Sequence, residues 1–100
     1  MRRFPPLDPA ARRVLAFNFT ADLAPGDTLS GATVTAALQA GSDETPAQIL
    51  VGLPAIDGAR VLQLATGRAD DNAYTLKCIA STTAGEVLTL TAVITMQEGA

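Results

Sequence analysis

Apolar and polar residues alternate most regularly in the last third of the chain, between residues 71 and 96. Two alternating segments are joined there by a short polar turn at residues 82–85. A period of two places successive side chains on opposite faces of a β-strand. One face would carry Tyr74, Leu76, Cys78, Ala80, Leu88, Leu90, Ala92 and Ile94, and the other would carry mainly threonine, including Thr89, Thr91 and Thr95. The pattern predicts a half-buried antiparallel hairpin.

Shorter segments with the same alternation precede this hairpin. Residues 14–20 predict a strand whose core face carries Leu15, Phe17 and Phe19. Residues 28–38 predict a second strand, because their β-branched residues favour strand over helix, and its inward residues are Ala32, Val34, Ala36 and Leu38.

The middle of the chain adds a short apolar run and a second hairpin. Residues 48–53 lie between two prolines and predict a strand by their length. Asp57-Gly58 is a strong turn dipeptide, so residues 53–56 and 60–66 predict the two arms of a hairpin. Both faces of residues 61–64 carry apolar side chains, which is expected where both faces are partly covered.

These elements predict an all-β fold, an immunoglobulin-like antiparallel β-sandwich of six to seven short strands with an extended N-terminal arm. Residues 14–97 would form the single β-sandwich domain, and residues 1–13 the basic arm. The immunoglobulin-like assignment follows from spacing: Asp70 or Asp71 comes shortly before Tyr74, and Tyr74 shortly before Cys78. In such domains a tyrosine at the start of the penultimate strand bonds to upstream backbone.

The arm carries most of the positive charge of an acidic protein. Arg2, Arg3, Arg12 and Arg13 lie in the first thirteen residues, whereas the whole chain has a net charge of −3. A pI near 4.6 argues against nucleic-acid binding by the domain. Two interpretations of the arm stay open: a mobile tail, or an arm that orders on a neighbouring subunit with its arginines pairing to carboxylates. In the second, Phe4 joins the four arginines as a partner-binding residue.

The sequence offers little for catalysis or for a cofactor. There is no histidine, which removes the usual nucleophile triads and zinc ligand sets. The single cysteine, Cys78, lies on the predicted core face, where a thiol behaves as a small apolar group. Asp43-Glu44 and Asp70-Asp71-Asn72 are expected to be turn residues, with calcium binding as the alternative. We therefore expect no enzyme activity, no cofactor and no metal site.

The cysteine count and the apolar stretches of the sequence also indicate where the protein is assembled. One cysteine cannot form an intramolecular disulfide, so the reducing cytoplasm is the expected place of assembly. No stretch of the sequence has the length and apolar character of a signal-peptide core or a membrane span. We expect a protein that contacts neither membrane nor nucleic acid.

An ordered series of short motifs spans residues 8–95. It comprises Asp8-Pro9, Phe17-Asn18-Phe19, Leu23, Gly26-Asp27-Thr28-Leu29, Thr33-Val34-Thr35, Tyr74-Thr75-Leu76, Cys78 and Thr82-Thr83-Ala84-Gly85. In this combination the chain resembles small β-sandwich virion proteins of tailed bacteriophages, a family of fibre-to-tail or neck adaptor proteins. The resemblance implies a virion structural protein, present in several copies, that links the portal or head-tail connector to tail fibres or other tail parts.

Two other functions remain open from the sequence. A decoration protein that binds the capsid shell would share this fold and composition. A carbohydrate-binding or adhesion module is disfavoured, because exposed aromatic residues for stacking on a sugar ring are scarce.

Overall fold

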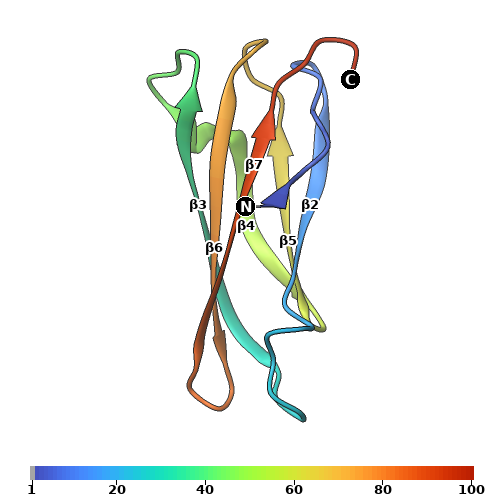
Figure 1. Cartoon of the computed structure of the whole chain (residues 1–100), viewed down its shortest axis with the longest axis vertical. Coiled ribbons are helices and arrows are strands. Elements are labelled where there is room, and N and C mark those ends of the chain that lie inside the picture. Colours follow the sequence, from blue (N-terminus) through green and yellow to red (C-terminus); the bar gives the residue numbers. More distant parts are fainter. Residues whose placement is uncertain (1) are drawn as a thin grey trace.

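The structure is a computed structural model that describes residues 2–100, and it is a sandwich of two β-sheets (Figure 1). A short 3-10 helix, η1 (Pro46–Ile49), precedes the fourth strand. The strands are β1 (Arg2–Arg3), β2 (Arg12–Asn18), β3 (Leu29–Ala40), β4 (Leu50–Asp57), β5 (Arg60–Thr66), β6 (Ala73–Thr82) and β7 (Val87–Thr95). The predicted all-β fold is confirmed.

The strand order is β1-β7-β6-β3 in one sheet and β2-β5-β4 in the other. All neighbours are antiparallel except β1 and β7, which run parallel. Seven-stranded immunoglobulin-like domains have the same division, with the second, fifth and fourth strands facing the third, sixth and seventh. Here the first strand joins the edge of the β7-β6-β3 sheet. The sandwich is elongated, measuring 42 × 24 × 22 Å.

The core lies between the sheets and includes many of the residues predicted from alternation, whereas five predicted inward residues are only partly buried: Ala32, Ala36, Leu38, Leu88 and Leu90. Leu15, Phe17 and Phe19 are buried, and so are the inward residues of β6. Together with Leu7, Ile49, Val61 and Met96 they form one continuous cluster, whose largest members are Tyr74, Phe19 and Leu15. The predicted hairpin also forms, with β6 and β7 in register from Ala73 opposite Thr95 to Ser81 opposite Val87.

The structure differs from the predictions around residues 46–53. Gln48 and Ile49 belong to η1 and not to a strand, because Pro46 opens a helical turn there and the turn buries the Ile49 side chain completely. The strand begins at Leu50, two residues later than predicted. The facing of β5 is also settled: Val61, Gln63 and Ala65 point inward and are buried.

The N-terminal arm lies along the sandwich of its own chain. The Phe4 amide donates to the Val93 carbonyl at 2.9 Å, and the Leu7 amide donates to the Thr95 carbonyl at 3.0 Å. Leu7 is only 2% exposed and belongs to the core cluster. Packing is therefore continuous across the predicted boundary between residues 13 and 14, and β2 already begins at Arg12. Met1 of the predicted arm lies outside the described residues.

Gly67 provides a test of how closely the N-terminal arm packs against the sandwich. A Cβ atom at Gly67 would collide with the backbone carbonyl oxygens of Asp8 and Pro9, whereas one at Gly31 would meet nothing within 4 Å. We expect Gly67→Ala to lower the free energy of unfolding by about 1–3 kcal/mol, because backbone must move to make room. Gly31→Ala should leave it unchanged or raise it slightly. Urea denaturation of both variants measures the difference, and equal stabilities would contradict a seated arm.

Candidate partner-binding site

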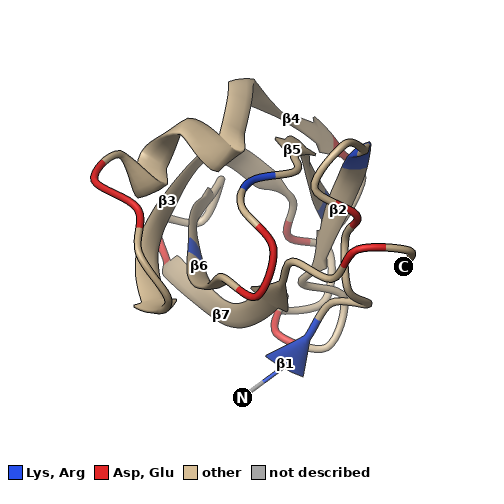
Figure 2. Cartoon of the chain, turned by 90° about the horizontal axis from the view of Figure 1, so that it is seen from above, with Lys and Arg blue, Asp and Glu red and all other residues tan. Residues whose placement is uncertain are grey.

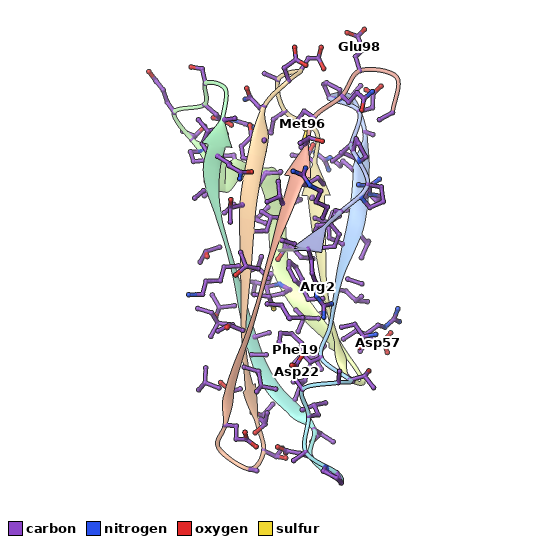
Figure 3. The ribbon with its side chains drawn as sticks, viewed as in Figure 1. Arg2, Phe19, Asp22, Asp57, Met96 and Glu98 are labelled. Carbon is purple, nitrogen blue, oxygen red and sulfur yellow. The ribbon has the colours of Figure 1, made fainter. Side chains whose placement is uncertain are left out.

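Three of the predicted partner-binding residues are exposed on the long side of the sandwich. Arg2 and Arg3 form β1 at the edge of the four-stranded sheet, and Figure 3 shows Arg2 near mid-height. Arg12 begins β2, opposite Thr66 of β5. All three side chains are exposed, and none forms a salt bridge within residues 2–100. They are available to a partner.

The other two predicted residues, Arg13 and Phe4, hold the arm to its own chain. The Arg13 guanidinium donates to the Pro6 carbonyl at 3.3 Å and also to the Pro5 carbonyl. The Phe4 ring meets the Phe17 ring edge-on, with centroids 5.3 Å apart and an interplanar angle of 90°. Neither interpretation made from the sequence, a mobile tail or an arm on a neighbour, foresaw these intramolecular contacts. Carbonyl acceptors carry no sequence signal, so only the fold could show them.

Charge is divided between the ends and the sides of the molecule. Acidic residues lie in loops and turns, except for Asp57 at the end of β4 (Figure 2). Figure 3 shows Glu98 at one end and Asp22 and Asp57 in the opposite half of the molecule. The first end also carries Asp8, Asp43, Glu44, Asp70 and Asp71, and the second end carries Asp27 and Glu86. Arg2 and Arg3 lie between the acidic ends, whereas Arg60 and Arg68 are paired with Asp57 and Asp43.

A polar network at the first end surrounds Asp43. Arg68 binds both of its carboxylate oxygens, with Nε 3.0 Å from Oδ2 and Nη2 2.9 Å from Oδ1. The Tyr74 hydroxyl donates to Asp43 Oδ2 at 2.6 Å and accepts from Asn72 Nδ2 at 3.0 Å. Arg68, and after it Tyr74, hold the pKa of the Asp43 carboxyl well below its usual range. Burial, and then the bond to Asp43, raises the pKa of Tyr74.

This network modifies two predictions. Tyr74 does lie at the start of the penultimate strand and is buried, but its hydroxyl contacts the side chains of Asp43 and Asn72, not upstream backbone. Asp43 was expected to be a turn residue, with calcium binding as the alternative: its Oδ1 accepts from the Thr45 amide at 2.9 Å within the loop, and its carboxylate also pairs with Arg68. Residues 2–100 contain no group of three side chains placed to hold a metal ion.

Two further aspartates connect distant segments. Asp27 Oδ1 accepts from the Thr83 hydroxyl at 2.7 Å and from the Ala84 amide at 3.2 Å, which joins the β2–β3 loop to the β6–β7 turn. Asp8 accepts from the amides of Ala10, at 2.8 Å, and Gly99, at 2.9 Å. The Thr83 hydroxyl lowers the pKa of Asp27, and the Ala10 and Gly99 amides lower that of Asp8. These carboxylates order the loops.

Cys78 lies in the core as predicted. Its side chain is fully buried, and that burial raises the pKa of the thiol to about 11. A protonated, enclosed thiol is a poor nucleophile. The part of the chain that the structure describes also contains no pocket and no helix long and apolar enough to cross a membrane.

The Asp43 network predicts a pH-dependent loss of stability. Tyr74→Phe should lower the free energy of unfolding by about 1.5–3 kcal/mol at pH 7, because the charged carboxylate loses a buried donor. Asp43→Asn should also destabilise the protein at pH 7. The folded-state pKa of Asp43 is lowered, so its contribution is complete above the ordinary aspartate pKa of about 3.9 and is lost as the pH falls through the folded-state pKa.

Denaturation with urea at pH 7 and at pH 3 tests this dependence. The difference between the unsubstituted protein and Asp43→Asn should narrow at the lower pH. Glu44→Gln is the matched control, since Glu44 is the exposed neighbour and should change stability little at either pH. A constant difference between the two pH values would contradict the role given to the carboxylate.

Comparison with known proteins now bears on the function of this sandwich. No curated protein sequence matches the chain. The family model described as "Podophage GP4 fiber-tail adaptor protein gp77" matches residues 7–95. The match starts at Leu7, the first buried residue of the arm, and ends at Thr95, the last residue of β7. Since it covers nearly the whole sandwich, it confirms the resemblance seen in the motifs, and the chain belongs to the podophage fibre-tail adaptor family.

Proposed function

We propose that the protein is a non-enzymatic adaptor that joins the portal or head-tail connector of a phage particle to its tail fibres, in several copies per particle. The observation that carries this proposal is the family match over residues 7–95. A tail adaptor is a component of the virion and contacts other virion proteins. The identity of the two neighbours, the copy number and assembly in the host cytoplasm are parts of the proposal.

The form of the molecule suits such a linking role. Its loops are fastened at both ends by the carboxylates of Asp8, Asp27 and Asp43, so the ends keep a defined shape. Between them, Arg2, Arg3 and Arg12 are exposed and able to pair with carboxylates of a neighbour. In a multi-copy assembly, the acidic end of one copy is a suitable surface for the basic side of the next.

Binding of the full chain to purified virion proteins tests the proposal. We expect native mass spectrometry to detect complexes with the tail-fibre protein and with the portal or connector protein. Exclusive binding to the major capsid protein would overturn the proposal in favour of a capsid decoration protein. A chain that stays monomeric and binds none of the three would exclude both functions.

The exposed arginines predict how this binding depends on salt. The triple substitution Arg2→Gln, Arg3→Gln and Arg12→Gln should weaken binding to the tail-fibre protein or to the portal or connector protein on the order of tenfold at low salt. The loss should come mainly from slower association, and the affinity of the variant should change less with salt concentration. Lys77→Gln is the control, because Lys77 is an exposed cation of β6 that lies outside the arm and forms no salt bridge within residues 2–100. Biolayer interferometry at several salt concentrations measures both variants.

Point substitutions are needed here because deleting residues 1–13 would also remove Leu7 from the core and Arg13 from β2. Loss of binding after that deletion would not separate folding from contact. If the triple substitution left affinity and salt dependence unchanged, the arginines would have no part in partner binding.

A further inference from the structure

The outer face of the β2-β5-β4 sheet is apolar where it meets solvent. The strand register places Val14 opposite Leu64 and Ala16 opposite Leu62, and on the other side of β5 it places Val51 opposite Leu64 and Ala55 opposite Leu62. Their strand neighbours Leu15, Phe17, Val61 and Gln63 point into the core. We call the six outward residues the apolar face: Val14, Ala16, Val51, Ala55, Leu62 and Leu64. None of them packs against the core cluster.

The outer face of the β1-β7-β6-β3 sheet is the comparison, because its solvent-exposed residues are mostly polar. The outward residues of β3, β6 and β7 are mostly polar, with Lys77 in the centre and Ile79, Val87 and Val93 as the apolar exceptions. The threonines among them are Thr33, Thr35, Thr75, Thr89, Thr91 and Thr95. A sheet that is half buried ordinarily has polar residues on its solvent side. The same chain therefore builds one polar and one apolar outer face, and an exposed apolar patch of this kind marks an interaction surface.

A bulge in β4 projects one more leucine beside the apolar face. The register moves from Val51 opposite Leu64 to Ala55 opposite Leu62, so Gly52, Leu53 and Pro54 all stand opposite Gln63. Gly52 has a φ of +70°, a conformation that glycine adopts without strain. Leu53 is 93% exposed as a result.

The bulge is fixed from inside the sandwich. Gln63 is 1% exposed, and its Nε2 atom donates to the carbonyls of Val51, at 3.2 Å, and Gly52, at 3.3 Å, as well as to that of Leu64 at 2.9 Å. A buried side-chain amide thus supplies donors that a regular strand pair would supply from backbone. Leu53 is held outward by this arrangement.

Polar residues surround the apolar face. Arg12 and Thr66 lie at one end of it, and Asn18, Arg60 and Asp57 lie at the other. Asp57 and Arg60 neutralise each other at 2.6 Å, which leaves Arg12 as the unpaired charge among these rim residues. An apolar centre with a polar, arginine-containing rim is the usual anatomy of a protein interface.

The size and shape of the surface decide what binds there. Three strands about 4.8 Å apart and seven residues at about 3.3 Å each give an area of roughly 300 Å². A stable dimer buries about 800 Å² per partner, so two copies joined through this face alone would fall short. Residues 2–100 also contain no pocket that could receive Leu53 of a second copy.

We propose that the apolar face and Leu53 bind a different virion protein, one that offers an apolar surface with a recess for Leu53 and a carboxylate opposite Arg12. This inference rests on the proposed adaptor function and names the surface that performs it. Because the area is small, the contact is one of several that act together in the multi-copy assembly. Leu53, as a large apolar side chain entering a recess, is its anchor.

Substitution of exposed side chains tests the proposal without disturbing the core. Leu53→Gln and Val14→Gln are compared with the matched control Val87→Gln, since Val14 is 55% exposed and Val87, on the other sheet, is 64% exposed. The probes are the purified tail-fibre protein and the purified portal or connector protein, with affinity measured by biolayer interferometry. We expect Leu53→Gln and Val14→Gln each to weaken binding to one of these proteins by about tenfold or more. Val87→Gln should stay within about twofold.

A second measurement locates the contact directly. Leu53→Cys is labelled with a photoreactive maleimide, and because Cys78 is fully buried the label goes to the introduced thiol. Irradiation of the complex should cross-link Leu53→Cys to the partner, whereas Val87→Cys treated in the same way should give no cross-link to that protein.

The outcomes separate the two proposals. If the unsubstituted chain binds its partners and both face variants bind equally well, the apolar face is not the binding surface and the adaptor function stands. If the unsubstituted chain binds neither protein, the adaptor function fails, and this inference fails with it. If the face variants change the sedimentation of the chain alone, the surface joins copies of this chain, which overturns the proposed partner.

Discussion

The fold depends on carboxylates that hold the chain where it crosses between the two sheets. The chain passes from β3 to β4 and returns from β5 to β6 at the same end, and the Asp43–Arg68 pair joins those two crossings. Tyr74, the largest fully buried side chain, completes the junction from the start of β6. Without this bond a buried hydroxyl and a guanidinium would lose their shared acceptor, which is costly in a region closed to water.

Similar carboxylate contacts serve the other crossings. Asp27 fastens the crossing from β2 to β3 against the β6–β7 turn, and Asp8 fastens the crossing from the arm to β2 against the C-terminal residues. Acidic side chains are useful at these places because loop amides and hydroxyls need acceptors. Much of the acidity of the two ends therefore follows from folding. Arg2, Arg3 and Arg12 are exposed and take no part in these carboxylate contacts.

Sequence alternation predicted the strands and the core well because it depends on local geometry. The inward positions of Leu15, Phe17, Phe19 and Tyr74 follow from a period of two alone. It failed at Ile49, where an apolar run between prolines forms a buried helical turn. It also missed Leu7, a single apolar residue among prolines and charges, because no period can be read from one residue.

The contacts of the candidate site were harder to predict, because they join residues that are distant in the sequence or involve backbone groups that every residue has. Arg68 and Asp43 are 25 residues apart in the sequence, and nothing local connects them before the crossings are known. Arg13 binds backbone carbonyls, which every residue has. The apolar face did leave a signal, since Leu62 and Leu64 alternate with Val61 in β5 and make both faces of the strand apolar. From the sequence alone, this pattern predicts that both faces of β5 are partly covered. Only the structure shows that the outer face of β5 is not covered by another part of this chain.

Under the proposed binding role of Leu53, the cost of the β4 bulge to folding is offset by partner binding. A regular β4 would pair with β5 along its whole length and leave position 63 free for an aliphatic residue, which packs in a core without needing hydrogen-bond partners. The chain instead breaks the ladder at Gly52, exposes Leu53 and buries the Gln63 amide to satisfy the carbonyls released by the break. The broken ladder, the exposed leucine and the buried amide each lower the stability of the isolated domain, and none of them improves the packing of its core. Departures from local rules that do nothing for folding are expected where a protein meets a partner, and here they concentrate at one strand, beside the apolar face.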